Sequence, residues 1–169
     1  MYDDVVGNFA FRVVQQDSPV TGIVPGPLHA SLSKSTICWI EVPTDEVPVP
    51  RKKRSGPKPD YMSGRTWPVW YGYENGKVYV LVGEGEQQVP GLTDATTVKL
   101  IARSKDLQSH VAEVECGVEV LAKDDAWTEL ARDVLVGRRL NLPDGDAAVD
   151  RWRSTCEVVS LTPLPPAVE

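Results

Sequence analysis

The feature that most constrains the fold is an Asn75-Gly76 pair set between two long apolar runs. The run before the pair is RTWPVWYGYE, and the run after it is KVYVLVG. A type I′ turn needs positive φ at both of its central residues, and Asn-Gly meets that need better than most other pairs. The sequence therefore predicts a β-hairpin over residues 65–83.

Both arms of this hairpin carry apolar side chains on both faces. In the first arm, one face carries Trp67, Val69 and Tyr71, and the opposite face carries Trp70. In the second arm, one face carries Val78, Val80 and Val82, and the opposite face carries Tyr79 and Leu81. A strand without a polar face is buried on both sides. We therefore expect a barrel interior on one side and a partner subunit or a ligand on the other. Pro68 lacks a backbone N–H, so we expect it at a bulge or at an unpaired edge.

Five other segments have the composition or the alternation of β-strands. They are residues 8–15, 35–42, 96–103, 109–121 and 154–163. In the fourth, we expect Ala112, Val114, Cys116, Val118 and Val120 to face inward, with Glu113, Glu115 and Glu119 facing outward. Gly117 in the middle of this long strand is expected to mark a bulge.

Strand 96–103 carries two cations on one face. Lys99 and Arg103 are four residues apart, which is about 13 Å along a strand, and Lys105 follows just beyond. One interpretation is a polar strand face that pairs with Glu113 and Glu115 on the next strand. The other is an anion site formed by Lys99, Arg103 and Lys105, and the residues leave both open.

Residues 124–137 are predicted to form the main helix. Its apolar positions follow the spacing of a single helical face, and they are Trp127, Leu130, Ala131, Val134 and Leu135. Asp124 or Asp125 is expected to cap its start, and Gly137 to end it. Residues 28–34 could form a turn or two of helix, and residues 147–152 a further short helical piece.

These elements predict an α+β fold, with six or seven mostly antiparallel strands in a small barrel and one main helix. At 169 residues we expect one domain over 1–169. Its parts are an N-terminal strand and connector (1–27), a barrel core (28–163) and a Pro-rich tail (164–169). A loop over 43–64 contains five prolines and the run RKKR (51–54). This basic run could be a solvated loop, a nucleic-acid or targeting patch, or a loop that folds over an anionic ligand.

The overall composition disfavours several classes of protein. A net charge of −6 argues against broad nucleic-acid binding. No apolar run approaches the ~20 residues of a membrane span, and the acidic N-terminal sequence lacks the pattern of a signal peptide. We therefore expect a cytoplasmic protein without membrane contact. The three cysteines are expected to be buried free thiols, and two histidines without a paired ligand motif predict no metal site.

The strand order resembles the FMN-binding split β-barrel family, which includes pyridoxamine-phosphate-oxidase-like proteins and relatives that use flavin or deazaflavin. The stretches that carry the resemblance are STICWIEV, RTWPVWYGYENGKVYVLVG, GEGEQQVPGL, TTVKLIARSKD and the late helix followed by STCEVVSLTP. It covers about residues 28–163. It implies a split β-barrel fold, a homodimer, and FMN or a deazaflavin bound in a groove at the dimer interface.

The resemblance also implies which residues would contact the cofactor. Val69 and Trp70 would line the ring system. The turn after the hairpin, with Gly83, Gln87 and Gln88, would approach the phosphate or the ribityl chain. The segment Arg103, Ser104 and Lys105 would supply positive charge. The turn itself, GEGEQQ, carries two carboxylates and no cation, whereas the family has Ser or Thr followed by Lys or Arg there.

Three functions are compatible with this pattern. The first is a flavin- or deazaflavin-dependent oxidoreductase, in which the cofactor does the chemistry and no residue is identified as catalytic. The second is a split barrel without any cofactor that works as a binding or interaction protein, which the cation-free turn favours. The third is a barrel that binds haem, for which only His29 and His110 could be axial ligands.

Overall fold

The structure is a computed structural model that describes residues 26–44, 66–103, 111–139 and 142–166. Several sequence predictions fall outside these residues. They are the strand at 8–15, most of the loop at 43–64 with its basic run, and the residues Ser104, Lys105 and His110.

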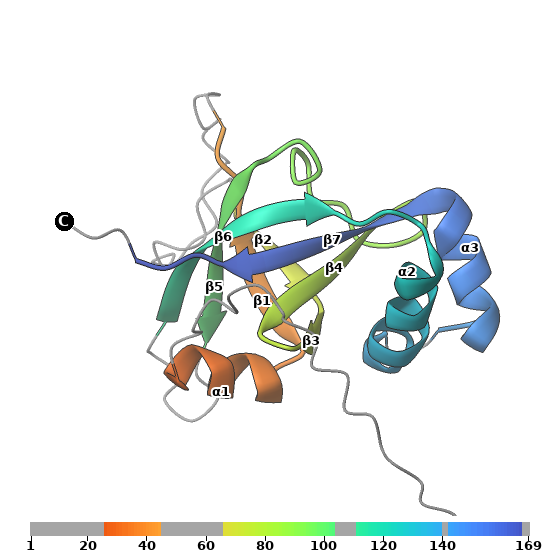
Figure 1. Ribbon diagram of the computed structural model, residues 1–169, viewed down its shortest axis with the longest axis horizontal. Helices are drawn as coiled ribbons and strands as arrows, with labels where there is room; N and C mark the ends of the chain where they lie inside the picture. The colour runs from red at the N-terminus through yellow and green to blue at the C-terminus, as the bar shows by residue number, and fades with distance from the viewer. Residues whose placement is uncertain (1–25, 45–65, 104–110, 140–141, 167–169) are drawn as a thin grey trace, which may run out of the picture.

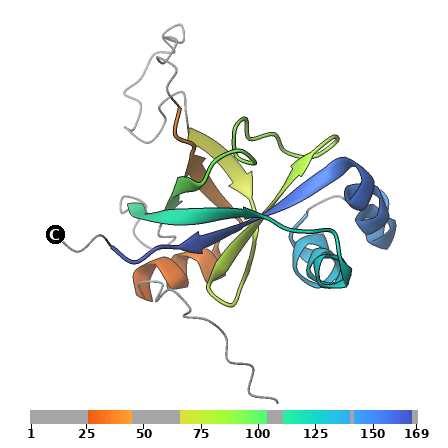
Figure 2. The same ribbon diagram turned by 45° about the horizontal axis from the view of Figure 1, so that its top comes forward.

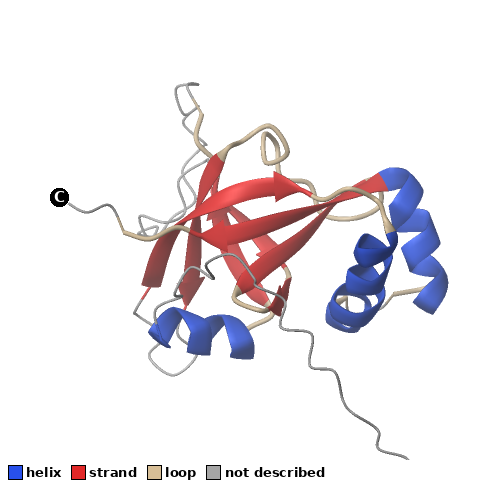
Figure 3. Ribbon diagram, viewed as in Figure 1, coloured by secondary structure: helices blue, strands red, loops and turns tan. Residues whose placement is uncertain are grey.

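The core of the molecule is one antiparallel sheet of seven strands (Figures 1 and 3). The strands are β1 (Ile37–Glu41), β2 (Thr66–Trp70), β3 (Gly72–Glu74), β4 (Lys77–Gly83), β5 (Thr97–Arg103), β6 (Val111–Val120) and β7 (Cys156–Pro163). Their order in the sheet is β2-β1-β5-β6-β7-β4-β3. The two end strands, β2 and β3, are separated in the chain by Tyr71 alone. The sheet therefore curls round on itself, and the predicted α+β split barrel is confirmed.

The predicted hairpin turn is present, but its first arm has two partners rather than one. Asn75 and Gly76 have φ values of 51° and 76°, as a type I′ turn requires. Only β3 pairs with β4, whereas β2 pairs with β1. We call the junction around Tyr71, where one end of the sheet meets the other, the seam. Pro68 lies in β2, which is an edge strand, as its missing N–H predicted.

The barrel interior is an apolar core built from all parts of the sheet. Its buried members include Ile40, Val80, Leu100 and Val159, each with 0% exposure. Helix α1 (Gly26–Lys34) adds Leu28 and Leu32 to this core. The hydroxyl of Tyr71 donates a hydrogen bond of 2.8 Å to the Leu32 carbonyl, which ties the helix to the seam.

A second core lies between the outer face of β4 and β7 and a layer of helices (Figure 2). The layer contains α2 (Asp125–Leu130), a π-helical segment (Ala131–Leu135), two 3₁₀ turns (Val136–Arg138 and Gly145–Ala147) and α3 (Ala148–Thr155). Trp127, Leu135 and Trp152 pack there against Leu81 and Val158. The sequence predicted one main helix and allowed short helical pieces at 28–34 and 147–152. The described chain has three α-helices, and α1 and α3 lie at those two pieces.

The ends of the predicted main helix are partly as expected. The Asp124 carboxylate accepts a hydrogen bond of 2.9 Å from the Trp127 backbone N–H, so the predicted cap is confirmed. The helical run continues through Gly137 to Arg138, so the prediction that Gly137 ends the helix was wrong. Gly137 lies inside a 3₁₀ turn, and a left-handed cap is not formed there.

Strand β6 corrects two further predictions. Gly117 pairs with Thr97 on one side and Thr162 on the other in an unbroken register, so it marks no bulge. Val120, at the end of the strand, is 41% exposed rather than inward-facing and buried. The alternation ends there because β6 extends past β5, whose pairing with it stops at Gly117.

The three cysteines are buried free thiols, as the sequence predicted. Cys38 and Cys116 lie in the barrel interior and Cys156 in the second core. Burial raises the pKa of all three thiols, that of Cys116 to about 12. At neutral pH these groups therefore remain protonated, and they behave as small apolar side chains.

Candidate functional site

The end of β4 and the residues after it form a tight turn beside the seam. We call residues 83–88 the seam turn. The Glu86 N–H donates to the Gly83 carbonyl at 3.2 Å, and the Gly83 N–H donates to the Gln87 carbonyl at 3.3 Å. Gly85 has a φ of 77°, which is the left-handed conformation that a type II turn needs at its third residue. The second glycine of GEGE thus serves the turn geometry.

The first glycine of the seam turn serves a close backbone contact. A Cβ atom on Gly83 would lie 2.5 Å from the Thr155 carbonyl oxygen and 2.6 Å from Cys156 Cα. The Glu84 N–H also donates to that Thr155 oxygen at 3.2 Å. The seam turn is therefore held directly against the start of β7. Both glycines are explained by the fold alone, without a phosphate to cradle.

Glu86 is the anchor of the seam turn. Its side chain is 1% exposed, and it lies among three donors from distant parts of the chain. Arg139 Nε is 2.9 Å from Oε2, while Arg151 Nη1 and Trp152 Nε1 are 3.3 Å and 2.9 Å from Oε1. A buried carboxylate is tolerated when cations and hydrogen bonds surround it. Glu86 therefore points into the helical layer and not toward solvent.

The cations around Glu86 have other partners as well. Arg151 Nε is 2.8 Å from Asp144 Oδ2. The Arg151 guanidinium holds the pKa of the Asp144 carboxyl below its usual value, and that contact raises the pKa of Arg151 further. Arg139 lies 6.0 Å above the Trp70 ring, in the range of a cation–π contact. The network therefore reaches from α3 to the first strand of the seam.

Gln87 completes the seam with its side chain. Its Oε1 accepts a hydrogen bond of 3.0 Å from the Trp70 backbone N–H, and its Nε2 donates one of 2.8 Å to the Trp70 carbonyl. These are the two bonds that a neighbouring strand would otherwise make. Gln88 Nε2 in turn donates to the Gly83 carbonyl at 2.6 Å.

The bonds at Trp70 define the chemistry of the outer edge of β2. The Trp70 N–H and C=O point away from β1. Backbone groups alternate in direction along an antiparallel strand, so the backbone of Pro68, two residues earlier, also points away from β1. Pro68 has no N–H to offer there. Pro68 lacks a donor at this edge, and the Gln87 side chain already bonds the backbone of Trp70. Both features hinder the addition of another strand.

The predicted site residues are thus only partly together. The structure brings Trp70, Gly83 and Gln87 into one cluster. Val69, by contrast, is 1% exposed and belongs to the barrel interior, so its side chain is not on the outer surface. Arg103 is the last residue of β5, and Ser104 and Lys105 lie beyond the described residues.

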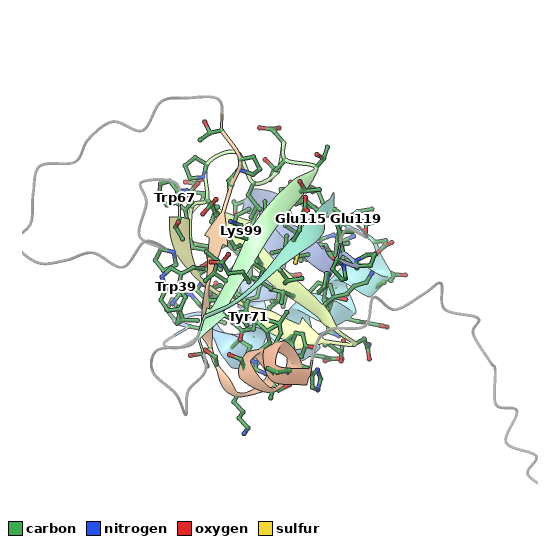
Figure 4. All side chains as sticks on the ribbon, turned by 90° about the vertical axis from the view of Figure 1, so that its left-hand side faces the viewer. Trp39, Trp67, Tyr71, Lys99, Glu115 and Glu119 are labelled. Atoms are coloured by element: carbon green, nitrogen blue, oxygen red, sulfur yellow. The ribbon has the colours of Figure 1, made fainter. Side chains whose placement is uncertain are left out.

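Lys99 is engaged by carboxylates on both neighbouring strands. Its Nζ is 3.8 Å from Glu41 and 3.7 Å from Glu113, and it stands opposite Glu115 in the register (Figure 4). The interpretation of this strand face as a charge-paired surface is therefore confirmed for Lys99. These groups are substantially exposed, so each pair contributes little to stability.

An apolar patch lies on the outer face of β1 and β2. We define the outer patch as Ile37, Trp39 and Pro68, of which Ile37 is 41% exposed. Trp39 stands opposite Pro68, and Ile37 stands opposite Trp70. On the other side Trp39 stands opposite Ile101 of β5, and Arg103, the last residue of that strand, lies two residues further along it.

Sequence reasoning missed the partners of the seam turn. These partners lie 53 to 66 positions after Glu86 in the sequence. Three of them contact Glu86 directly, and the fourth contacts it through Arg151: Arg139, Arg151 and Trp152, then Asp144. The only signal in the sequence is complementary charge, an acidic turn and two later segments that contain arginines. Complementary charge alone does not indicate which arginine pairs with which carboxylate.

Within the described residues there is no group of three or more side chains suited to a metal ion. His29 Nδ1 is 2.7 Å from the Tyr73 hydroxyl, so this histidine would bind haem iron through its other ring nitrogen, Nε2, if it kept that contact. No helix in the described chain is long and apolar enough to cross a membrane.

The described chain has a split β-barrel fold, as the resemblance implied. No family model matches the sequence, and no curated protein matches it. Among solved structures, it is similar to a conserved hypothetical protein from Mycobacterium tuberculosis, with a TM-score of 0.53 and 12% identity over 89% of this chain and 86% of that one.

Two further solved structures have lower TM-scores. One is the haem storage protein HutZ from Vibrio cholerae, with a TM-score of 0.49 and 9% identity over 81% of this chain and 87% of the other. The other is a 5-nitroimidazole antibiotic resistance protein, so described, from Bacteroides thetaiotaomicron, with a TM-score of 0.48 and 15% identity over 81% and 78%. At such identities the likeness concerns the fold alone.

Proposed function

We propose that this chain is a homodimeric split-barrel protein that binds a flavin-type cofactor, FMN or a deazaflavin, and serves as an oxidoreductase. The observation that carries the proposal is the outer patch. Ile37, Trp39 and Pro68 form an apolar surface on an edge of the sheet, where a planar ring or a second subunit would cover them. The cofactor would supply the redox chemistry, and the protein would supply binding and orientation.

The charge around the patch supports one arrangement of the ligand. Lys99 is paired with carboxylates, and the carboxylate of Glu86 is buried in the helical layer. A phosphate or other acidic tail would therefore be bound by Arg103 together with Lys105. Arg103 is the last residue of β5, two residues beyond Ile101, which stands opposite Trp39 of the patch. The ring and the acidic tail would then occupy adjacent positions.

The first test is the absorption spectrum of the purified protein, followed by titration with FMN, riboflavin and a deazaflavin. We expect either bound yellow cofactor or a saturable change in ligand fluorescence. Arg103→Ala should weaken FMN about tenfold, because it removes a charge-assisted contact, and should leave riboflavin unaffected. Arg132→Ala, an exposed arginine of the helical layer, is the matched control. Equal FMN affinity in both variants would refute the assignment of Arg103.

A second function is favoured by a different observation. The side chains of Glu86, Gln87 and Gln88 all make contacts within the chain, so the seam turn leaves few polar groups for a cofactor. This favours a split barrel without a cofactor that binds a macromolecular partner, with the outer patch as the contact surface. A colourless protein whose melting temperature does not change with FMN, FAD or deazaflavin would favour this function over the first.

A further inference from the structure

Two buried polar side chains of the described residues have no hydrogen-bond partner. They are the indole N–H of Trp127 in α2 and the hydroxyl of Ser160 in β7, and each residue is 1% exposed. Trp127 belongs to the second core, and Ser160 lies on the face of β7 that Val158 turns toward that core. A buried donor without an acceptor disfavours the packed arrangement by about tenfold. The contact between the helical layer and the sheet is therefore weaker than its apolar packing alone indicates.

The helical layer is also built from short pieces. Helix α2 has six residues, the π-helical segment five and α3 eight. Helices shorter than about 12 residues are marginal in water by themselves, so these pieces depend on their packing against the sheet. The second core shares no residue with the core of the barrel interior. Removal of the layer would therefore leave the barrel interior intact.

The layer is joined to the sheet at one place and held elsewhere by a single carboxylate. Strand β6 leads into α2, and α3 ends at Thr155, where β7 begins. Both helices lie beyond the same end of these two strands (Figure 1). The Leu121 N–H donates to the Val158 carbonyl at 2.9 Å, which keeps the two connections side by side. Glu86 of the seam turn holds the layer through its three donors.

We propose that the helical layer is a lid, which opens as one unit from the outer face of β4 and β7 while the barrel stays folded. In the open form, water reaches the Trp127 N–H and the Ser160 hydroxyl. The same movement uncovers an apolar surface that includes Leu81 and Val158, and it takes the donors of the layer away from Glu86. The lid therefore controls both this surface and the freedom of the seam turn. The proposal needs no cofactor and does not rest on the proposed function.

The three buried cysteines report on the two cores separately. Cys156 lies in the second core, whereas Cys38 and Cys116 lie in the barrel interior. A thiol reagent reaches Cys156 when the lid opens, and it reaches the other two only when the barrel unfolds. The experiment labels the wild type with methyl methanethiosulfonate at several urea concentrations below the unfolding transition. Mass spectrometry of the peptides gives the labelling rate of each cysteine.

We expect Cys156 to be labelled at least tenfold faster than Cys38 and Cys116. Its rate should increase with urea, because opening exposes new surface. The increase should be less steep than for the other two cysteines, because the lid is only part of the surface that global unfolding exposes.

A pair of serine variants tests the role of the unpartnered hydroxyl. Ser160→Ala removes a group that gains hydrogen bonds to water only in the open form, so it should slow the labelling of Cys156 about tenfold. Ser154→Ala is the matched control in α3, since the Ser154 hydroxyl already donates to the Arg151 carbonyl at 2.9 Å. It should leave the labelling rate within about threefold of the wild type.

Labelling of Cys156 that does not depend on urea would overturn the proposal, because it indicates a local movement at the start of β7. Equal rates and equal urea dependence for all three cysteines would also overturn it, because they indicate global unfolding. So would equal effects of Ser160→Ala and Ser154→Ala. Should Ser160→Ala fail to fold, amide hydrogen exchange of the wild type decides. The amides of α2 and α3 must then share one free energy of opening, below that of the amides of β5.

Discussion

The barrel interior and the seam beside it are held together by different chemistry. The interior is a set of buried aliphatic side chains from the strands and α1, such as Leu32, Val80 and Leu100. The seam is held by polar contacts of Glu86 and Gln87 that reach residues 17 to 66 positions away. An apolar core tolerates many arrangements of similar volume, whereas the polar network depends on a few particular donors and acceptors.

This difference shows what closes the split barrel. Where two strands run side by side, the backbone closes the sheet by itself. At Trp70 the neighbouring strand is missing, and a side chain supplies the two bonds instead. The seam turn is therefore a structural strap as well as a candidate ligand site, and variants can separate the two regions.

The largest effect is expected for a substitution in the interior. Leu100→Ala removes a fully buried side chain in the middle of β5, and we expect it to lower the free energy of unfolding by about 2–5 kcal/mol. Val120→Ala, at a position that is 41% exposed on β6, should change it by less than about 0.5 kcal/mol. Urea denaturation monitored by tryptophan fluorescence measures both. Similar losses in the two variants would contradict the description of the core.

A smaller effect is expected where the seam turn meets β7. Gly83→Ala would set a methyl group 2.5 Å from the Thr155 carbonyl oxygen, so the backbone would have to shift. We expect a loss of about 1–3 kcal/mol. Gly137→Ala, at a position with nothing within 4 Å of the added Cβ, should be neutral or slightly stabilising. The comparison fails if the two variants have the same midpoint of urea denaturation.

The smallest effect concerns the outer end of the network and depends on pH. Because Arg151 lowers the pKa of Asp144, the carboxylate contributes stability above its ordinary pKa, near 4. That contribution is lost as the pH falls through the lowered pKa. Asp144→Asn should therefore flatten the acid limb of the stability curve below about pH 4. Melting temperatures at a series of pH values test this, and parallel acid limbs in the variant and the wild type would refute it.

The interior could be predicted from the sequence because its signals are local. The alternation of Val98, Leu100 and Ala102, the Asn75-Gly76 turn and the Asp124 cap each depend on residues a few positions apart. The edge position of Pro68 also followed from its own chemistry. The continuation of the helical run past Gly137 did not, because the glycine does not adopt the left-handed conformation of a helix end there.

The seam could not be predicted in the same way. The segment GEGEQQ indicated a turn, but the direction of each side chain depends on where the helical layer lies. Glu86 could equally have faced solvent beside Glu84, and only the positions of Arg139, Arg151 and Trp152 turn it inward. Gln87 was predicted to approach a phosphate or a ribityl chain, and the sequence did not indicate the bonds of its side chain to Trp70, because they depend on the change of strand partner at Tyr71.

The most direct test of the central claim, that the seam turn is an internal strap, compares two substitutions of the same kind in that turn. Glu86→Gln and Glu84→Gln remove the same charge two residues apart, but Glu86 is 1% exposed and Glu84 is exposed. Urea denaturation at pH 7 should show a loss of about 2 kcal/mol for Glu86→Gln, because charged hydrogen bonds to Arg139 and Arg151 are lost. Glu84→Gln should stay within about 0.5 kcal/mol of the wild type. Equal effects of the two substitutions would contradict the account.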